Sequence, residues 1–145
     1  GAEHPSRANI MEAALWLIKD AKPGDCLFFY FSGHGAQKED PDCAEEECMD
    51  ETILPADFQT AGGHIIDDQL FQVMIRWLPS GVKLTAVMDC CHSGTGLDLP
   101  FTYEGGDAGA GKWTCDDNPC HSHGHVVLLS GCREDQTVTS ADVQS

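Results

Sequence analysis

Two short apolar runs constrain the fold of this chain more than any other feature. The first extends from Cys26 to Phe31 and the second from Leu84 to Met88. Continuous apolar runs of this length are typical of strands that are covered on both faces of a sheet. A third run, from Val126 to Ser130, has the same character. We therefore expect three strands at the centre of the molecule.

Helical patterns precede the first two strands. Ser6 can cap a helix that runs to about Asp20, because the apolar residues after it recur on one helical face. A second helix is expected to begin with Asp67 or Asp68 as its cap and to stop before Pro79. Helices that alternate with buried strands predict an α/β fold with a largely parallel sheet.

Two polar segments are expected to be loops. Residues 39–51 are acidic and polar, and residues 99–125 are rich in Gly, Asp, Cys and His without an apolar period. Segments of this kind run over the surface of a protein and often carry its functional residues. We therefore expect both segments at the surface.

Composition argues against several classes of protein. The 145 residues suffice for one domain, and 41% of them are apolar, so a sizeable core can form. Eight Lys and Arg against 24 Asp and Glu give a formal net charge of −16, which disfavours binding to nucleic acid or to a membrane surface. No apolar run approaches the ~18 residues of a membrane span. The eight cysteines, several of them in or beside apolar runs, favour a reducing, cytoplasmic compartment over a disulfide framework.

Two of the expected strands end in reactive side chains. His34 lies three positions past Phe31, and Cys91 lies three positions past Met88. Neighbouring parallel strands place their carboxyl ends at one edge of the sheet, so the imidazole and the thiol would emerge side by side. An imidazole can take the proton of a thiol and later pass it to a leaving amine. Backbone N–H groups near Gly35 and at Cys91 could stabilise the oxyanion of a tetrahedral intermediate, so the pair predicts a cysteine hydrolase.

Five segments, in the same order along the chain, resemble the metacaspases, a family of caspase-like cysteine peptidases. They are Phe31 to Gly35, Asp50 to Asp57, Ile66 to Asp68, Asp89 to Gly94 and Ser130 to Thr137. The resemblance implies a caspase-like sandwich, in which helices flank a mostly parallel central sheet, incomplete at both ends. Residues 1–145 would form a partial catalytic domain of the p20 type, with the p10-type region starting near residues 126–145.

The resemblance also implies roles for single residues. His34 and Cys91 would form the catalytic dyad, with Cys91 rather than Cys90 as the nucleophile, and cleavage would follow Arg or Lys. Asp89 matches the family's acidic specificity position, where a carboxylate can meet a guanidinium through two hydrogen bonds. Ser32 is expected to line the same pocket. Alternatively, Asp89 caps a strand end or anchors a turn.

A calcium site is implied by the same resemblance. Asp67 and Asp68 match the calcium-binding pair of the family, and the acids that correspond to Asp50 and Asp98 join them. Calcium takes about six to eight oxygen ligands, which clustered carboxylates can supply, and its binding could order the nucleophile loop and switch activity on. Asp67 and Asp68 could also be simple capping residues that the helix dipole favours.

A competing metal site would be a zinc site in the second polar segment. Its candidate ligands are Cys115, Cys120, His121, His123 and His125. Their spacing is not that of a standard zinc finger, so we favour a variable surface loop. Cys43 and Cys48 raise the same question with less support. Lys112 in this segment is a candidate self-cleavage point, because the family's zymogens are processed and the implied cleavage follows basic residues.

The leading hypothesis is a calcium-stimulated cysteine endopeptidase that acts on proteins or peptides with Arg or Lys before the scissile bond. We expect a monomer, or a chain associated with its own remaining segments, that binds neither nucleic acid nor membranes. Two alternatives stay open. One is a caspase-like peptidase with a different specificity, and the other is a catalytically silent calcium-binding or scaffold module.

Overall fold

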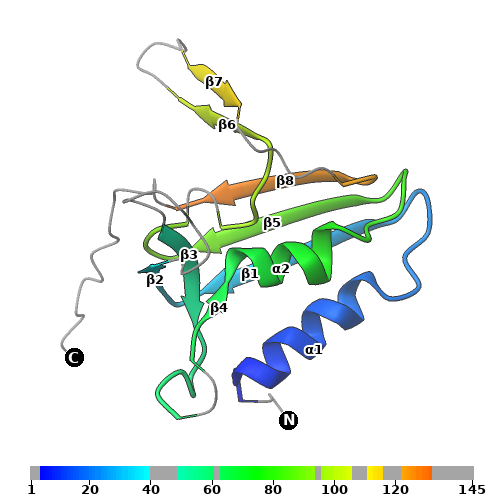
Figure 1. Cartoon of the computed structure of the whole chain (residues 1–145). Coiled ribbons are helices and arrows are strands. Elements are labelled where there is room, and N and C mark those ends of the chain that lie inside the picture. The colour runs from blue at the N-terminus through cyan, green and yellow to red at the C-terminus, as the bar shows by residue number, and fades with distance from the viewer. Residues whose placement is uncertain are drawn as a thin grey trace, which may run out of the picture.

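The structure is a computed structural model that describes residues 4–39, 49–60, 63–93, 96–105, 111–115 and 122–131. Its elements follow one another along the chain as Figure 1 shows. In order, they are α1 (Arg7–Ile18), β1 (Cys26–Ser32), β2 (His34–Glu39), β3 (Met49–Leu54), β4 (Ile65–Ile66), α2 (Asp67–Leu70), the π-helical turn η1 (Phe71–Ile75), β5 (Lys83–Asp89), β6 (Phe101–Glu104), β7 (Lys112–Cys115) and β8 (His125–Ser130).

The three predicted strands form the central sheet. β5 lies between β1 and β8, and both of its pairings are parallel. A smaller antiparallel sheet of β2, β3 and β4 stands at the carboxyl end of these strands, and the β6–β7 hairpin projects beyond β8 (Figure 1). The predicted α/β fold with a mostly parallel central sheet is therefore confirmed.

The core lies between this sheet and the helices. Side chains alternate along β5, so that Leu84, Ala86 and Met88 are buried while the residues between them are not. They pack with fully buried Met74 and Ile75 of η1. Both helical segments, α1 and α2 with η1, lie on the same side of the sheet (Figure 1). Burial of this one face is the main source of stability that the described residues show.

No helix among the described residues covers the opposite face of the sheet, which contradicts the expectation that the strands are covered on both faces. Phe28 and Tyr30 of β1 are 61% and 56% exposed, and Leu129 of β8 is 56% exposed. The register places Tyr30, Val87 and Leu129 in one row across the three strands. We call this side the open face. An apolar run shows that a strand has two apolar sides, but it does not show which described element packs on each.

The helices begin and end close to the predicted positions. The Ser6 side chain accepts a hydrogen bond of 3.3 Å from the backbone N–H of Asn9, as expected of a cap. The second helix has Ile66 at its cap position, so the expectation of an aspartate there is wrong, and Asp67 and Asp68 form the first turn instead. No helix in the described part of the chain has the length and apolar character needed to cross a bilayer.

The segments expected to be loops contain strands. β2 continues to Glu39 and β3 already starts at Met49, with the residues between them outside the described ranges. The second segment holds the β6–β7 hairpin, in which Lys112 is the first residue of β7 and pairs with Glu104. The loop expectation is therefore wrong for Phe101–Glu104 and Lys112–Cys115, and Lys112 lies in a paired strand.

Substitution of Leu84 by alanine should destabilise the protein by about 2–5 kcal/mol, because this side chain is 1% exposed and its loss leaves a cavity in the core. The same substitution at Leu15, which is 53% exposed on α1, serves as the matched control and should change the free energy of unfolding by less than about 0.5 kcal/mol. Urea unfolding of both variants measures the difference. Equal losses would contradict the assigned core.

Candidate active site

The carboxyl ends of β1 and β5 hold His34 and Cys91 at neighbouring positions of one sheet edge. Ser32 and Asp89 are register partners, and the N–H of Gly33 donates a hydrogen bond of 3.4 Å to the carbonyl of Asp89. His34 and Cys91 each follow this pair by two residues. We call the strand ends at residues 32–35, 89–93 and 130–131 the carboxyl edge.

Gly35 makes the closest approach between the two strand ends. A Cβ atom at this position would overlap the carbonyl oxygen of Cys91 and lie 3.4 Å from the Sγ of Cys90. Only a residue without a side chain allows this backbone contact. The predicted oxyanion donors, the N–H groups of Gly35 and Cys91, therefore belong to backbone segments that touch. Their use in catalysis stays a prediction.

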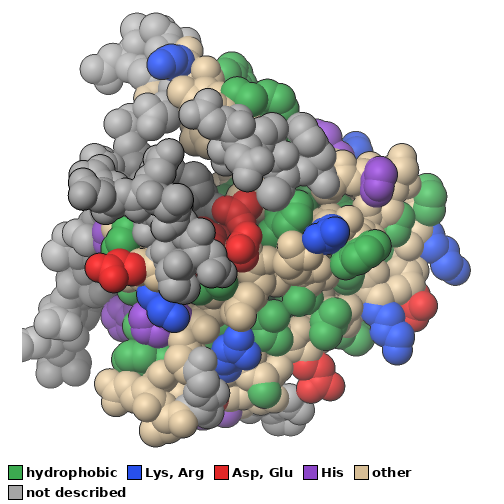
Figure 2. All heavy atoms as spheres, viewed as in Figure 1, with side chains coloured by type: hydrophobic (Ala, Val, Ile, Leu, Met, Phe, Trp, Pro, Cys, Tyr) green, Lys and Arg blue, Asp and Glu red, His purple; other side chains and the backbone are tan. Residues whose placement is uncertain are grey.

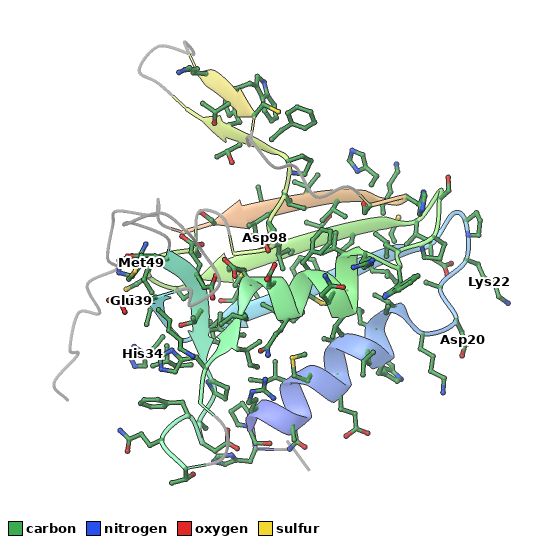
Figure 3. The ribbon with its side chains drawn as sticks, viewed as in Figure 1. Asp20, Lys22, His34, Glu39, Met49 and Asp98 are labelled. Carbon is green, nitrogen blue, oxygen red and sulfur yellow. The ribbon has the colours of Figure 1, made fainter. Side chains whose placement is uncertain are left out.

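His34 itself is exposed and opens β2, opposite Leu54 of β3. Figure 3 shows it at the lower end of the carboxyl edge, beside the small antiparallel sheet. Cys91 is half-buried in the turn that follows β5. The two backbones are therefore neighbours, while the predicted pairing of the imidazole with the Cys91 thiol stays a prediction.

The two adjacent cysteines differ in their surroundings. Cys90 is 2% exposed, and burial raises the pKa of its thiol to about 11. Its backbone carbonyl accepts a hydrogen bond of 2.9 Å from the Ser93 hydroxyl, which closes the turn. A thiol with so high a pKa stays protonated at neutral pH and is a poor nucleophile. Burial thus favours Cys91 over Cys90 as the reactive residue. Cys90 is part of the hydrophobic core.

Asp89 and Ser32 lie side by side on the open face, at the carboxyl edge. Both are exposed, and they are register partners on neighbouring strands. On the other side of Asp89 lies Gly131, where a Cβ atom would stand 3.3 Å from the Oδ1 of Asp89. The carboxylate is therefore flanked by a small polar residue and a glycine. The structure brings together the two residues predicted to bind the substrate.

Asp67 is the most deeply placed of the predicted metal ligands. It is 7% exposed, and its carboxylate accepts hydrogen bonds from the N–H groups of Glu51 at 3.0 Å and Asp68 at 2.9 Å. Burial is the main reason that its pKa is raised to about 6; the charges of Asp50 and Asp68 add to this effect, and the two hydrogen bonds oppose it. Asp50 and Asp68 therefore both lie close enough for their charges to act on Asp67.

The fourth predicted ligand, Asp98, lies between β5 and β6, apart in the sequence from the other three. It is half-buried with a backbone φ of 46°, and Figure 3 shows it above α2. Gly96, two residues earlier, lines a small pocket together with Asp67 and His92. Within the described ranges, no three His, Cys, Asp or Glu side chains are gathered as a metal site would require. The carboxylates thus have the chemistry that calcium prefers but not a preformed cage.

Glu51 is a buried acid that the sequence analysis missed. It is 3% exposed on β3, its backbone binds Asp67, and its charge contributes to the raised pKa of Cys90. Glu51 therefore lies between the predicted calcium ligand Asp67 and the turn that carries Cys91. The sequence does carry a signal, because Glu51 lies in one of the five family segments, but the acidic stretch around it predicts a loop.

The candidate zinc ligands are only partly described. Cys115 is exposed in β7, and His123 and His125 lie just before and at the start of β8. Cys120 and His121 lie outside the described residues, as do Cys43 and Cys48. The described members do not form a metal-binding group.

Comparison with known proteins assigns this chain to a peptidase family. Residues 1–100 match the model of the metacaspase, peptidase C14 domain. Metacaspase-1 of Kluyveromyces lactis is 57% identical over 99 residues, which are 68% of this chain and 23% of the relative. Metacaspase-2 of Trypanosoma brucei brucei is 45% identical over 149 residues, which cover 99% of this chain and 41% of the relative.

A solved structure supports the fold independently. A protein from Geobacter sulfurreducens superposes with a TM-score of 0.64 at 22% identity, over 92% of this chain and 55% of that one. Together, the fold and the family match define a domain of the caspase-like class of cysteine peptidases. The chain belongs to the metacaspase family. It spans less than half the length of the curated relatives described above.

Iodoacetamide at pH 8 should modify Cys91 at least about tenfold faster than Cys90, because burial keeps the Cys90 thiol protonated and out of reach. Peptide mass spectrometry with a time course measures the two rates. In urea the two rates should converge, which serves as the internal control. Rapid modification of Cys90 in the folded protein would contradict the assigned burial.

Proposed function

We propose that this protein is a cysteine endopeptidase that cleaves after Arg or Lys, with Cys91 as nucleophile and His34 as general base. The arrangement of the carboxyl edge carries the proposal. There, Gly35 contacts the backbone of Cys91, and Asp89 lies beside Ser32 two residues before the nucleophile. Membership of the metacaspase family supports the same chemistry.

The reaction would proceed through an acyl-enzyme. His34 takes the proton of the Cys91 thiol, and the thiolate attacks the carbonyl carbon of the scissile bond. The oxyanion that forms faces the N–H groups of Cys91 and Gly35. Collapse of the intermediate breaks the C–N bond as His34 returns the proton to the leaving amine. Water, deprotonated by His34, then attacks the thioester, and the new carboxylate leaves as Cys91 is regenerated.

Substrate choice would depend on the carboxylate of Asp89. An exposed carboxylate between a serine and a glycine can accept two hydrogen bonds from a guanidinium, or one strong contact from an ammonium group. The strongly acidic chain, with its net charge of −16, also attracts basic peptides over longer distances. We therefore favour cleavage after Arg or Lys over a caspase-like peptidase with another preference.

Replacement of Asp89 by asparagine should lower kcat/KM for peptides with Arg or Lys before the scissile bond by about 100-fold, because a cation would lose its charged partner. Initial rates with fluorogenic peptides that carry Arg, Lys, Asn or Asp at this position measure the effect. The profile should lose its preference for cations, while cleavage of the peptide with Asn stays unchanged or rises.

Two controls accompany this measurement. Asp20→Asn removes an equally negative side chain that is exposed far from the carboxyl edge, at a φ of 64° that asparagine tolerates, and should leave the profile unchanged. Cys91→Ala should abolish turnover, whereas Cys90→Ala should retain it. Full activity of Cys91→Ala would refute the proposed nucleophile, and an unchanged cation preference in Asp89→Asn would refute the proposed pocket.

We also propose that calcium stimulates this activity through Asp50, Asp67, Asp68 and Asp98. The Asp67 carboxylate, at the start of α2, is bound by the backbone of β3, and burial together with nearby like charges raises its pKa to about 6, so a cation would relieve an electrostatic cost. A bound calcium ion supplies positive charge and oxygen coordination. The small pocket shared by Asp67, His92 and Gly96 connects these acids to the segments on either side of the nucleophile turn.

The Asp67→Asn variant should bind calcium about tenfold more weakly than the parent and need correspondingly more calcium for activity. Affinity in the parent protein should also fall as the pH is lowered through about 6, because protonation of Asp67 competes with the cation. Isothermal titration at several pH values measures both effects. Calcium affinity that is unchanged in Asp67→Asn would contradict this site.

The remaining features of the proposal concern the setting of the enzyme. Cys26 is exposed and Cys90 buried, and both are free thiols, in keeping with a reducing compartment such as the cytoplasm. We propose protein substrates, a monomeric state, and a p10-type region that starts near residues 126–145.

A further inference from the structure

An aromatic cavity lies between the β6–β7 hairpin and β8, the strand at one side of the central sheet. Its volume is about 410 Å³, and it is lined by Tyr103 and Trp113 of the hairpin and by Leu129 of β8. The two hairpin rings lie 5.0 Å apart at a tilt of 48°. Trp113 nevertheless remains 67% exposed, and hydrophobic side chains gather on the hairpin at the top of Figure 2. Large apolar side chains exposed together usually mark a binding surface.

One end of the cavity lies next to Asp89, the residue proposed to bind the basic side chain of the substrate. Ser130 lines it, and the next residue, Gly131, is the one that flanks the carboxylate of Asp89. Leu129 faces the same side of the sheet as Asp89, one strand across and two residues back along the strand. These offsets, about 4.8 Å between strands and 6.6 Å along one, separate the two positions by about 8 Å. No described strand lies between them.

The order of the strands fixes which part of a substrate would reach the cavity. His34 follows β1, Cys91 follows β5, and the hairpin borders β8, so the base and the cavity lie on opposite sides of the nucleophile. His34 protonates the leaving amine, which places the carboxyl-terminal part of the substrate on the β1 side. The amino-terminal part, which stays attached to Cys91 in the acyl-enzyme, therefore extends toward β8.

We propose that this cavity is a specificity subsite that takes a large apolar or aromatic side chain of the substrate, two or three residues before the basic residue. The inference rests on the proposed peptidase function. An extended peptide advances about 3.3 Å per residue, so two or three residues cover the distance from Asp89 to the cavity. Tilted aromatic rings and a leucine offer the surface that a phenylalanine or leucine side chain prefers.

Peptide profiling of the full chain tests this subsite. Fluorogenic peptides with Arg before the scissile bond would carry Phe, Leu, Gly or Asp two or three residues earlier. The parent should cleave the Phe and Leu peptides at least about tenfold faster, in kcat/KM, than the Gly peptide. Trp113→Ala should reduce that ratio below about twofold, mainly by slowing the Phe and Leu peptides, and Trp113→Phe should retain most of the preference.

Matched controls separate the subsite from the fold and from the proposed function. Trp77→Ala removes a tryptophan that is 69% exposed away from the hairpin and should leave the profile unchanged. Leu129→Ala alters the opposite wall of the cavity and should weaken the preference even if the hairpin is sensitive to substitution.

The outcomes are distinguishable. Cleavage that depends on Arg but is indifferent to the earlier residues would overturn the subsite alone. A preference that both Trp113→Ala and Leu129→Ala leave intact would also overturn the subsite. If these variants change the oligomeric state but not the cleavage profile, the cavity serves self-association instead. Absence of cleavage of every Arg peptide by the parent would overturn the proposed function, and the subsite with it.

Discussion

The approach of Gly35 to the carbonyl of Cys91 is the contact on which the carboxyl edge depends. A side chain at position 35 would overlap that carbonyl, so any other residue would push β2 away from the turn after β5. The hydrogen bond from Gly33 to Asp89 continues the β1–β5 ladder up to this point. The positions of His34 and Cys91 are therefore set by backbone contacts between regular elements, which position a site more accurately than mobile loops can.

Acidic residues are gathered next to the carboxyl edge, where Glu51 and Asp67 are buried. The Asp67 carboxylate accepts two backbone hydrogen bonds, yet its pKa is raised to about 6, because the cost of burial outweighs what those bonds return. Glu51 and Cys90 are buried close by, and burial, with smaller effects from Glu51 and other nearby charges, disfavours the thiolate form of Cys90. This layer gains more from an added cation than an exposed acidic patch would, because screening by water is weaker there.

The sequence predicted the parts of the molecule that depend on long patterns. The apolar runs of β1 and β5 identified buried strands, and the reactive residues after them identified the edge, because parallel strands must end together. It did not predict the hairpin, since Phe101 and Tyr103 alternate over only four residues inside a Gly-rich stretch. Nor could it predict that Phe28 faces outward, because an apolar run carries no information on which side receives a helix.

The strict alternation of β5 also explains why the two adjacent cysteines that follow it have different surroundings. Met88 and Cys90 point into the helical side, while Asp89 lies on the open face and Cys91 follows in the turn. A slip of one residue would bury the carboxylate of Asp89 among apolar side chains, at a cost of several kcal/mol, and would expose Met88. Core packing therefore fixes the register, and the register in turn selects which thiol meets solvent. For the proposed peptidase, hydrophobic burial would therefore favour Cys91 over Cys90 as the nucleophile before any catalytic contact is made.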